Sequence, residues 1–176
     1  TGGIVNHVTY HTLVTFPSGD ASEILPSLAA SWTVSEDGLT YTFTLDGNAV
    51  FSDGSKVEAS DVVFSFNRLK NVKAQPSFLT DPITAISAPD ASTVVITLAA
   101  QRPSFLSELT NTAFAVTNAD VVKANGGTED GAGDTGLDYL NQTSAGSGPY
   151  VLESWTAQEE TVLVRNPNYF GTAPYF

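Results

Sequence analysis

Residues 30–45 constrain the fold of this chain more than any other part of its sequence. Apolar residues alternate with polar ones at period two in residues 30–34 and again in residues 40–45. Between these runs lies the sequence Ser35-Glu36-Asp37-Gly38-Leu39. Gly38 supplies the positive φ that a tight turn requires, at low steric cost. The pattern therefore predicts an antiparallel hairpin with one aromatic, buried face.

Further hairpins and short helices are predicted along the rest of the chain. A second Asp-Gly turn lies in residues 51–55. Apolar residues then recur at helical spacing at Val62, Val63, Phe66 and Leu69, which predicts a core-facing helix over residues 59–69. Ser60 and Asp61 stand where a first turn favours a capping oxygen and a negative charge. The other predicted elements are a strand pair (83–88 and 93–98), a short helix opened by Pro103 (103–109), a helix begun by Asn118 or Asp120 and stopped by Gly126-Gly127, and a last hairpin (150–155 and 161–165).

These elements predict an α+β fold, a mixed α/β architecture in which antiparallel hairpins pack against helices. A chain of 176 residues, 41% of them hydrophobic, is long enough for one domain with a true core. Residues 126–136 are rich in glycine and acidic residues, and we expect them to form an exposed loop.

The charge balance and the rarity of metal-binding side chains exclude several classes of function. Seven Lys and Arg against nineteen Asp and Glu give a net charge of −12, which repels nucleic acids and anionic lipid surfaces. We interpret this acidity as a solubility feature. Cysteine is absent and only two histidines occur, so we predict no disulfide, no metal site and no cofactor. No apolar run approaches the ~20 residues that a membrane helix needs.

His7 and His11 stand four residues apart and admit two interpretations. On a helix they would share one face, where a metal would still need carboxylates from elsewhere. The preferred interpretation is that they flank a segment that packs Val8 and Leu13 inward.

Two rival functions are weighed against a binding protein. A hydrolase needs a nucleophile with its base, yet neither a Gly-x-Ser-x-Gly elbow nor a His-Glu-x-x-His motif occurs, so we predict that the chain is not an enzyme. A calcium-dependent extracellular binding module is the second rival, because Asp130, Asp134 and Gly136 resemble part of an acidic loop. Ala132 and Asn141 stand where that loop needs oxygen ligands, which favours a solvated loop instead.

Several motifs in a fixed order carry a resemblance to a known family. They are Leu-Pro-Ser-Leu-Ala-Ala-Ser-Trp (25–32), Ser-Glu-Asp-Gly-Leu-Thr-Tyr-Thr-Phe-Thr-Leu (35–45), Phe-Ser-Asp-Gly (51–54), Ala-Ser-Asp-Val-Val-Phe-Ser-Phe (59–66), Gly-Ser-Gly-Pro-Tyr (146–150) and Val-Arg-Asn-Pro-Asn-Tyr-Phe (164–170). In this order they resemble the oligopeptide-, dipeptide- and nickel-binding family 5 of extracytoplasmic solute-binding proteins, over nearly the whole chain.

The resemblance implies a type II periplasmic-binding-protein-like fold, of which this chain holds the first lobe only. Residues 1–25 would be a partial hinge-bearing subdomain, residues 26–141 the family-specific α+β subdomain, and residues 142–176 a return hairpin into the hinge-bearing subdomain. The second lobe would be absent, so we expect the chain to be a fragment, with a natural truncation as the alternative.

The resemblance also implies where a ligand would bind. Contacts in the family fall near the end of the first helix and at the return loop, which correspond here to His11, Thr12 and Leu13 and to Gly148, Pro149 and Tyr150. Peptide binders of the family often carry an acidic residue where His11 stands, because a carboxylate pairs with a peptide's α-ammonium. The cargo is therefore open between a peptide, a sugar, a nickel complex and another small solute.

The function implied by the resemblance is the receptor component of an ABC importer, which captures a small solute or peptide by closure of two lobes. Its partners would be that ligand and, for the full-length protein, the ABC permease subunits. We expect a monomer in an extracytoplasmic compartment, the periplasm or the cell surface, with a lipid anchor as one option.

Overall fold

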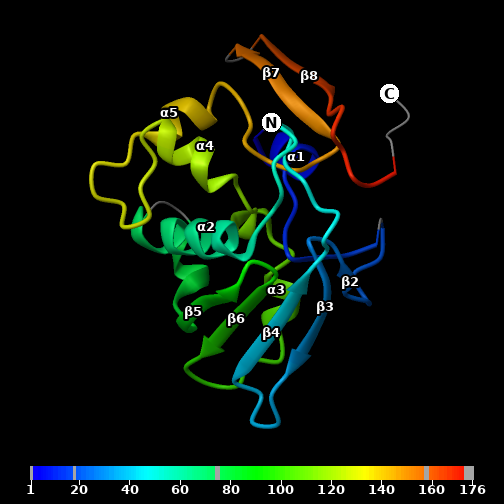
Figure 1. Cartoon of the computed structure of the whole chain (residues 1–176), viewed down its shortest axis with the longest axis vertical. Coiled ribbons are helices and arrows are strands. Elements are labelled where there is room, and N and C mark those ends of the chain that lie inside the picture. Colours follow the sequence, from blue (N-terminus) through cyan, green and yellow to red (C-terminus); the bar gives the residue numbers. More distant parts are fainter. Residues whose placement is uncertain (1, 18, 74–75, 157–158, 173–176) are drawn as a thin grey trace.

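The computed structural model of the protein describes residues 2–17, 19–73, 76–156 and 159–172. Groups of strands and groups of helices follow one another along the chain, and the hairpin β7–β8 lies beside α1 at one end of the molecule (Figure 1). The elements are α1 (Gly2–Thr9), β1 (Val14–Thr15), β2 (Leu25–Pro26), β3 (Ala29–Val34), β4 (Thr40–Leu45), α2 (Ala59–Asn71), the 3₁₀ helix η1 (Ser77–Thr80), β5 (Ile83–Asp90), β6 (Thr93–Leu98), α3 (Phe105–Glu108), the 3₁₀ helix η2 (Thr112–Phe114), α4 (Ala119–Ala124), α5 (Gly136–Leu140), β7 (Tyr150–Thr156) and β8 (Glu160–Arg165).

The largest sheet is antiparallel, with the strand order β3-β4-β6-β5. The predicted hairpin forms its first two strands, with Trp32 opposite Phe43 and Gly38 at a φ of 68° in the connecting turn. Burial alternates along β4 and β6, as expected of a sheet with one covered face. The buried side chains are Tyr41, Phe43 and Leu45 on β4 and Val94, Ile96 and Leu98 on β6.

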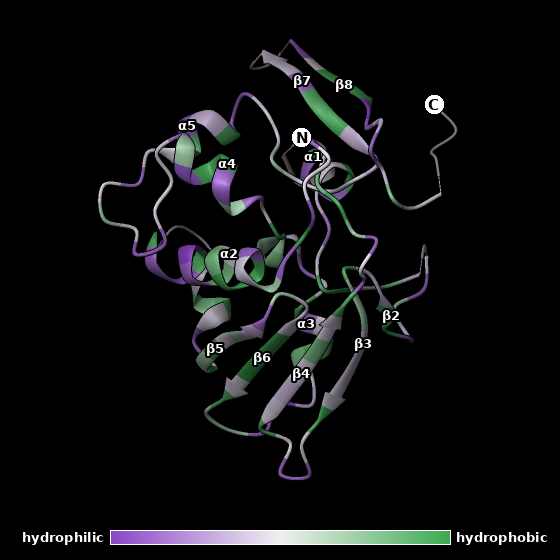
Figure 2. Ribbon diagram, in the orientation of Figure 1, coloured by the Kyte–Doolittle hydropathy of each residue, from purple (hydrophilic) through white to green (hydrophobic). Residues whose placement is uncertain are grey.

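Helices α2 and α3 contribute to the same hydrophobic core as this face of the sheet. Val62 and Phe66 of α2 are buried in it, and the ring of Phe105 on α3 lies 5.0 Å from the ring of Tyr41. Hydrophobic residues lie along β6 and on α2, whereas the loop between α4 and α5 is largely polar (Figure 2). The mixed α/β prediction with antiparallel hairpins is confirmed.

Helix α2 is buried on a second side that its hydrophobic stripe did not predict. Phe64 is 1% exposed and packs with Ala119 and Val122 of α4 in a smaller cluster. Asp61 links the two helices, because its carboxylate accepts hydrogen bonds from the N–H groups of Glu58 (2.9 Å) and Ala119 (2.9 Å). One buried side chain therefore satisfies orphan donors at the start of both α2 and α4.

We predict that Asp61→Ala lowers the free energy of unfolding by about 1–3 kcal/mol, because two N–H groups lose their acceptor. Urea denaturation measures the change, and the slope m should stay constant. The matched control is Asp120→Ala, which removes an exposed carboxylate one residue into α4 and should change stability by less than about 0.5 kcal/mol. Equal losses in the two variants would contradict the linking role of Asp61.

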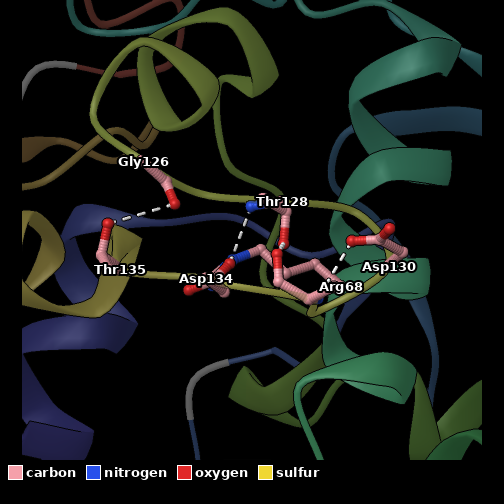
Figure 3. A network of polar contacts seen from close by, with 7 residues as sticks. Arg68, Gly126, Thr128, Asp130, Asp134 and Thr135 are labelled. Atoms are coloured by element: carbon pink, nitrogen blue, oxygen red, sulfur yellow. Dashed lines mark hydrogen bonds and ion pairs between the residues drawn. The ribbon is translucent and has the colours of Figure 1, made fainter.

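The expectation of an exposed loop over residues 126–136 is partly wrong. Asp134 is nearly buried and forms a bidentate ion pair with Arg68 of α2, with N–O distances of 2.7 Å (Figure 3). The same carboxylate accepts the N–H of Thr128 at 2.8 Å, and the hydrogen bonds from Arg68 hold the pKa of Asp134 below its ordinary value. Glu129 accepts from Asn67 at 2.6 Å. The loop is thus fastened to α2, and the carboxylates of Asp134 and Glu129 are engaged by protein donors.

Other elements depart from the sequence predictions in detail. The predicted helix 103–109 is shorter, since residues 102–105 form a turn closed by a hydrogen bond from Phe105 N–H to Arg102 C=O (2.9 Å). The sequence patterns did not indicate the short strands β1 and β2 or helix α5. Helix α1 ends at Thr9, so His7 and His11 do not share a helix face. Within the described ranges, no helix is long and apolar enough to span a bilayer.

Candidate functional site

The chain leaves α1 at Thr9 and continues through an extended segment that is bonded on both sides. The N–H of Val116 donates to His11 C=O at 2.9 Å, while the N–H groups of Leu28 and Ala29 donate to Thr12 C=O and Leu13 C=O at 3.1 and 2.9 Å. These backbone bonds hold residues 11–13 in a fixed position between η2 and the start of β3.

A glycine-containing return loop passes directly under the end of α1. The N–H of Gly148 donates to Thr9 C=O at 3.0 Å. A Cβ added to Gly148 would collide with backbone atoms of Val8 and Thr9, and one added to Gly146 would collide with the backbone of Thr9. The loop is buried, and Ser147 between the glycines is 0% exposed. Glycine is therefore required here for close backbone approach.

His11 lies between this loop and the last described segment of the chain. Its Nδ1 is 3.1 Å from the hydroxyl oxygen of Ser147. The ring of Tyr169 stacks on the imidazole with centroids 5.8 Å apart and an interplanar angle of 11°, and Phe170 meets it edge-on at 5.4 Å. The side chain is thus enclosed by a hydroxyl and two aromatic rings.

This enclosure changes the protonation of His11. Burial lowers its pKa from the ordinary value of 6.5 to about 4; a hydrogen bond with Ser147 opposes the shift, and His7 adds to it. Removing a charged imidazole from water without a carboxylate partner disfavours the cation. His11 is therefore neutral at pH 7 and offers a hydrogen-bonding imidazole instead of a positive charge.

The lowered pKa predicts a dependence of stability on pH. Below pH 6.5 the unfolded chain takes up a proton on His11, whereas the folded chain does not until about pH 4. The stabilising contribution is present above pH 6.5 and is lost as pH falls towards 4, by up to about 3 kcal/mol. Denaturant titrations between these pH values should show a smaller loss for His11→Gln than for the parent chain.

His7→Gln is the matched control, because His7 is exposed and lies on α1. The three proteins carry the same carboxylates, so the difference between variants isolates the imidazole. A parallel loss of stability in the parent chain and in His11→Gln would show that His11 is not held neutral by the fold.

A pocket of about 490 Å³ opens beside His11, between α1, the β1–β2 pair, η2 and residues 169–170. Its polar lining includes Asn6, Ser27 and Thr112. Tyr10 lines it too, and its hydroxyl accepts a hydrogen bond from Ala145 N–H at 3.2 Å; burial raises the pKa of Tyr10 to about 12. Elements distant in sequence therefore converge on one concave surface, as ligand sites typically do.

The structure brings only some of the predicted ligand-contact residues to this pocket. His11, Thr12 and Pro149 line it. Leu13 is instead fully buried in the hydrophobic core, and Gly148 is buried where it packs under α1. Tyr150 begins β7, half-buried, and is not part of the pocket lining. Leu13 thus points into the core, whereas His11 and Thr12 lie at the pocket.

Sequence reasoning missed the contributions of Ser27, Thr112, Tyr169 and Phe170 to the pocket. Ser27 and the Tyr-Phe pair belong to motifs that carried the family resemblance, which was a usable signal for position. Thr112 had no such signal, because a short 3₁₀ helix has no periodic pattern.

The family model for bacterial extracellular solute-binding proteins, family 5 (Middle), matches residues 23–176. The chain belongs to this family. The probable D,D-dipeptide-binding periplasmic protein DdpA of Escherichia coli (strain K12) is 37% identical to this family 5 chain over 175 residues, which cover 98% of the chain and 33% of DdpA. The chain spans about a third of the length of the curated relatives it matches.

Solved structures of solute-binding proteins share the fold of the family 5 chain. MoaA from A. tumefaciens R10, in complex with mannopinic acid, has a TM-score of 0.83 and 31% identity, covering 96% of the chain and 33% of MoaA. DppA from Helicobacter pylori, in complex with the peptide STSA, has a TM-score of 0.78 and 29% identity, with coverages of 96% and 35%. The fold implied by the sequence motifs is confirmed, and the chain corresponds to part of such proteins.

Proposed function

We propose that this chain forms one wall of the ligand cleft in a two-lobed receptor that captures a small solute for an ABC importer. Family membership supports the receptor role, and the pocket beside His11 is the observation that carries the assignment of the cleft wall. On this proposal residues 26–141 form the family-specific subdomain, flanked by the hinge-bearing residues 1–25 and 142–176.

The cargo proposed for the whole protein is a small peptide or an amino-acid derivative. DdpA is named as a D,D-dipeptide-binding protein, DppA is in complex with the peptide STSA, and MoaA is in complex with mannopinic acid. A pocket of about 490 Å³ on one lobe suits part of a ligand of that size.

The proposed mechanism is capture by closure of two lobes. Ligand contacts made by both lobes stabilise the closed state, and the equilibrium shifts only by the difference in affinity between closed and open forms. The wall described here would supply one share of those contacts. On this proposal the receptor acts outside the cytoplasm as a monomer, passes its ligand to a permease and does no chemistry on it.

We predict that the 176-residue chain binds dipeptides or mannopinic acid at least a hundredfold more weakly than a two-lobed protein that contains it. Each lobe makes its own contacts to the same ligand, so a chain with one lobe lacks the binding free energy that the other lobe supplies. Isothermal titration of both proteins with the same solutes measures the ratio. Sub-micromolar binding by the chain alone would contradict closure as the source of affinity.

A bulky substitution in the pocket tests the assignment of the wall. Thr112→Trp should abolish the ligand-induced rise in the melting temperature of the two-lobed protein, because the indole fills the pocket. Thr33→Trp, at an exposed position of β3, should preserve it. Mass spectrometry should recover the solute unchanged; a chemically altered solute would contradict the receptor role.

A further inference from the structure

The pocket beside His11 has an unusual lining for a chain with a net charge of −12. No Asp, Glu, Lys or Arg lines it among the described residues. Its two ionisable imidazoles are that of His11, which burial keeps neutral at pH 7, and that of His7 at the exposed rim. The wall therefore offers no carboxylate to an ammonium group and no guanidinium to a carboxylate.

The wall nevertheless carries spare hydrogen-bonding capacity. Asn6, Ser27, Thr112 and Tyr169 come from four different segments, and within the described part of the chain none of their side-chain polar groups has an intramolecular hydrogen-bond partner. Burial raises the pKa of Tyr169, so its hydroxyl stays protonated and neutral. Four residues with neutral, unpaired polar groups thus line one pocket.

Other hydroxyl groups at the same pocket are already engaged. Thr12 donates to Val14 C=O at 2.7 Å, and Thr110 donates to Ser107 C=O at 2.7 Å. The engaged groups fix the backbone around the pocket, whereas the free ones are left for a ligand or for water. This division separates a structural set of hydroxyl groups from a set that a ligand can use.

We propose that this wall recognises an uncharged hydrogen-bonding part of the ligand, an amide or a hydroxyl-bearing segment, and does not bind an ionised terminus. The inference rests on the proposed function and narrows it. Amide and hydroxyl segments share the chemistry that the four free groups recognise, since each both donates and accepts hydrogen bonds. The aromatic rings of Tyr169 and Phe170 add an apolar side to the same pocket.

Nuclear magnetic resonance titration of the 176-residue chain tests this directly. The probes are zwitterionic alanyl-alanine, its neutral N-acetyl amide, and mannitol as a neutral polyol. We expect the neutral amide, mannitol or both to shift the backbone amide resonances of Ser27, Thr112 and Tyr169. Alanyl-alanine should bind no more tightly than its neutral amide. Affinity should change less than about twofold between about 20 and about 500 mM NaCl, because no charge pair is screened.

Variants separate the wall from a general surface effect. Thr112→Val removes one free hydroxyl at nearly constant side-chain volume. It should lower the affinity for the neutral probe roughly three- to tenfold. The matched control Thr33→Val, on the exposed side of β3, should have no effect.

The outcomes distinguish this inference from the proposed function. Binding of alanyl-alanine about tenfold tighter than its neutral amide, at the same residues, would overturn the neutral wall and leave the receptor role standing. Shifts that avoid the pocket for every probe would overturn both the neutral wall and the assignment of this pocket to the cleft. Selective shifts by the amide or by mannitol identify which neutral segment the wall prefers.

Discussion

The close passage of the return loop under the end of α1 is the constraint on which the candidate site depends. The hydrogen bond from Gly148 N–H to Thr9 C=O leaves no room for a side chain at this position. It brings Ser147 within 3.1 Å of the imidazole of His11, and the chain beyond β8 then places Tyr169 on the other side of that ring. A contact between two backbones therefore determines the environment, and hence the charge, of the side chain at the pocket.

The chain is strongly acidic, yet no Asp, Glu, Lys or Arg lines the pocket beside His11 among the described residues. Acidic side chains at turns cap their own backbone, as Asp37 and Asp53 do, and Asp134 is paired with Arg68. The pocket is instead lined by hydroxyls, an amide and aromatic rings. On our proposal the pocket binds its ligand through hydrogen bonds between neutral groups, whose strength salt does not screen.

The fold was predictable where structure is local. The period-two alternation and Gly38 predicted the hairpin, and the spacing of Val62 and Phe66 predicted α2. Contacts between distant residues were not predictable from patterns: Phe64 is buried because α4 packs there, and residues 126–136 are fastened because Arg68 meets Asp134. The site followed the same division. The family resemblance pointed to His11 through its place after the first helix, whereas its neutral state depends on burial by residues more than a hundred positions away.

The pKa of His11 in Gly148→Ala, followed by the imidazole resonances during a pH titration, tests this dependence most directly. A methyl group at residue 148 should push the loop from α1, lower the free energy of unfolding by roughly 1–3 kcal/mol and raise the pKa of His11 from about 4 towards 6.5. Gly47→Ala is the control, because a Cβ there meets nothing within 4 Å, and it should leave that pKa unchanged. A pKa that stays near 4 in Gly148→Ala would show that the glycine loop does not determine the environment of His11.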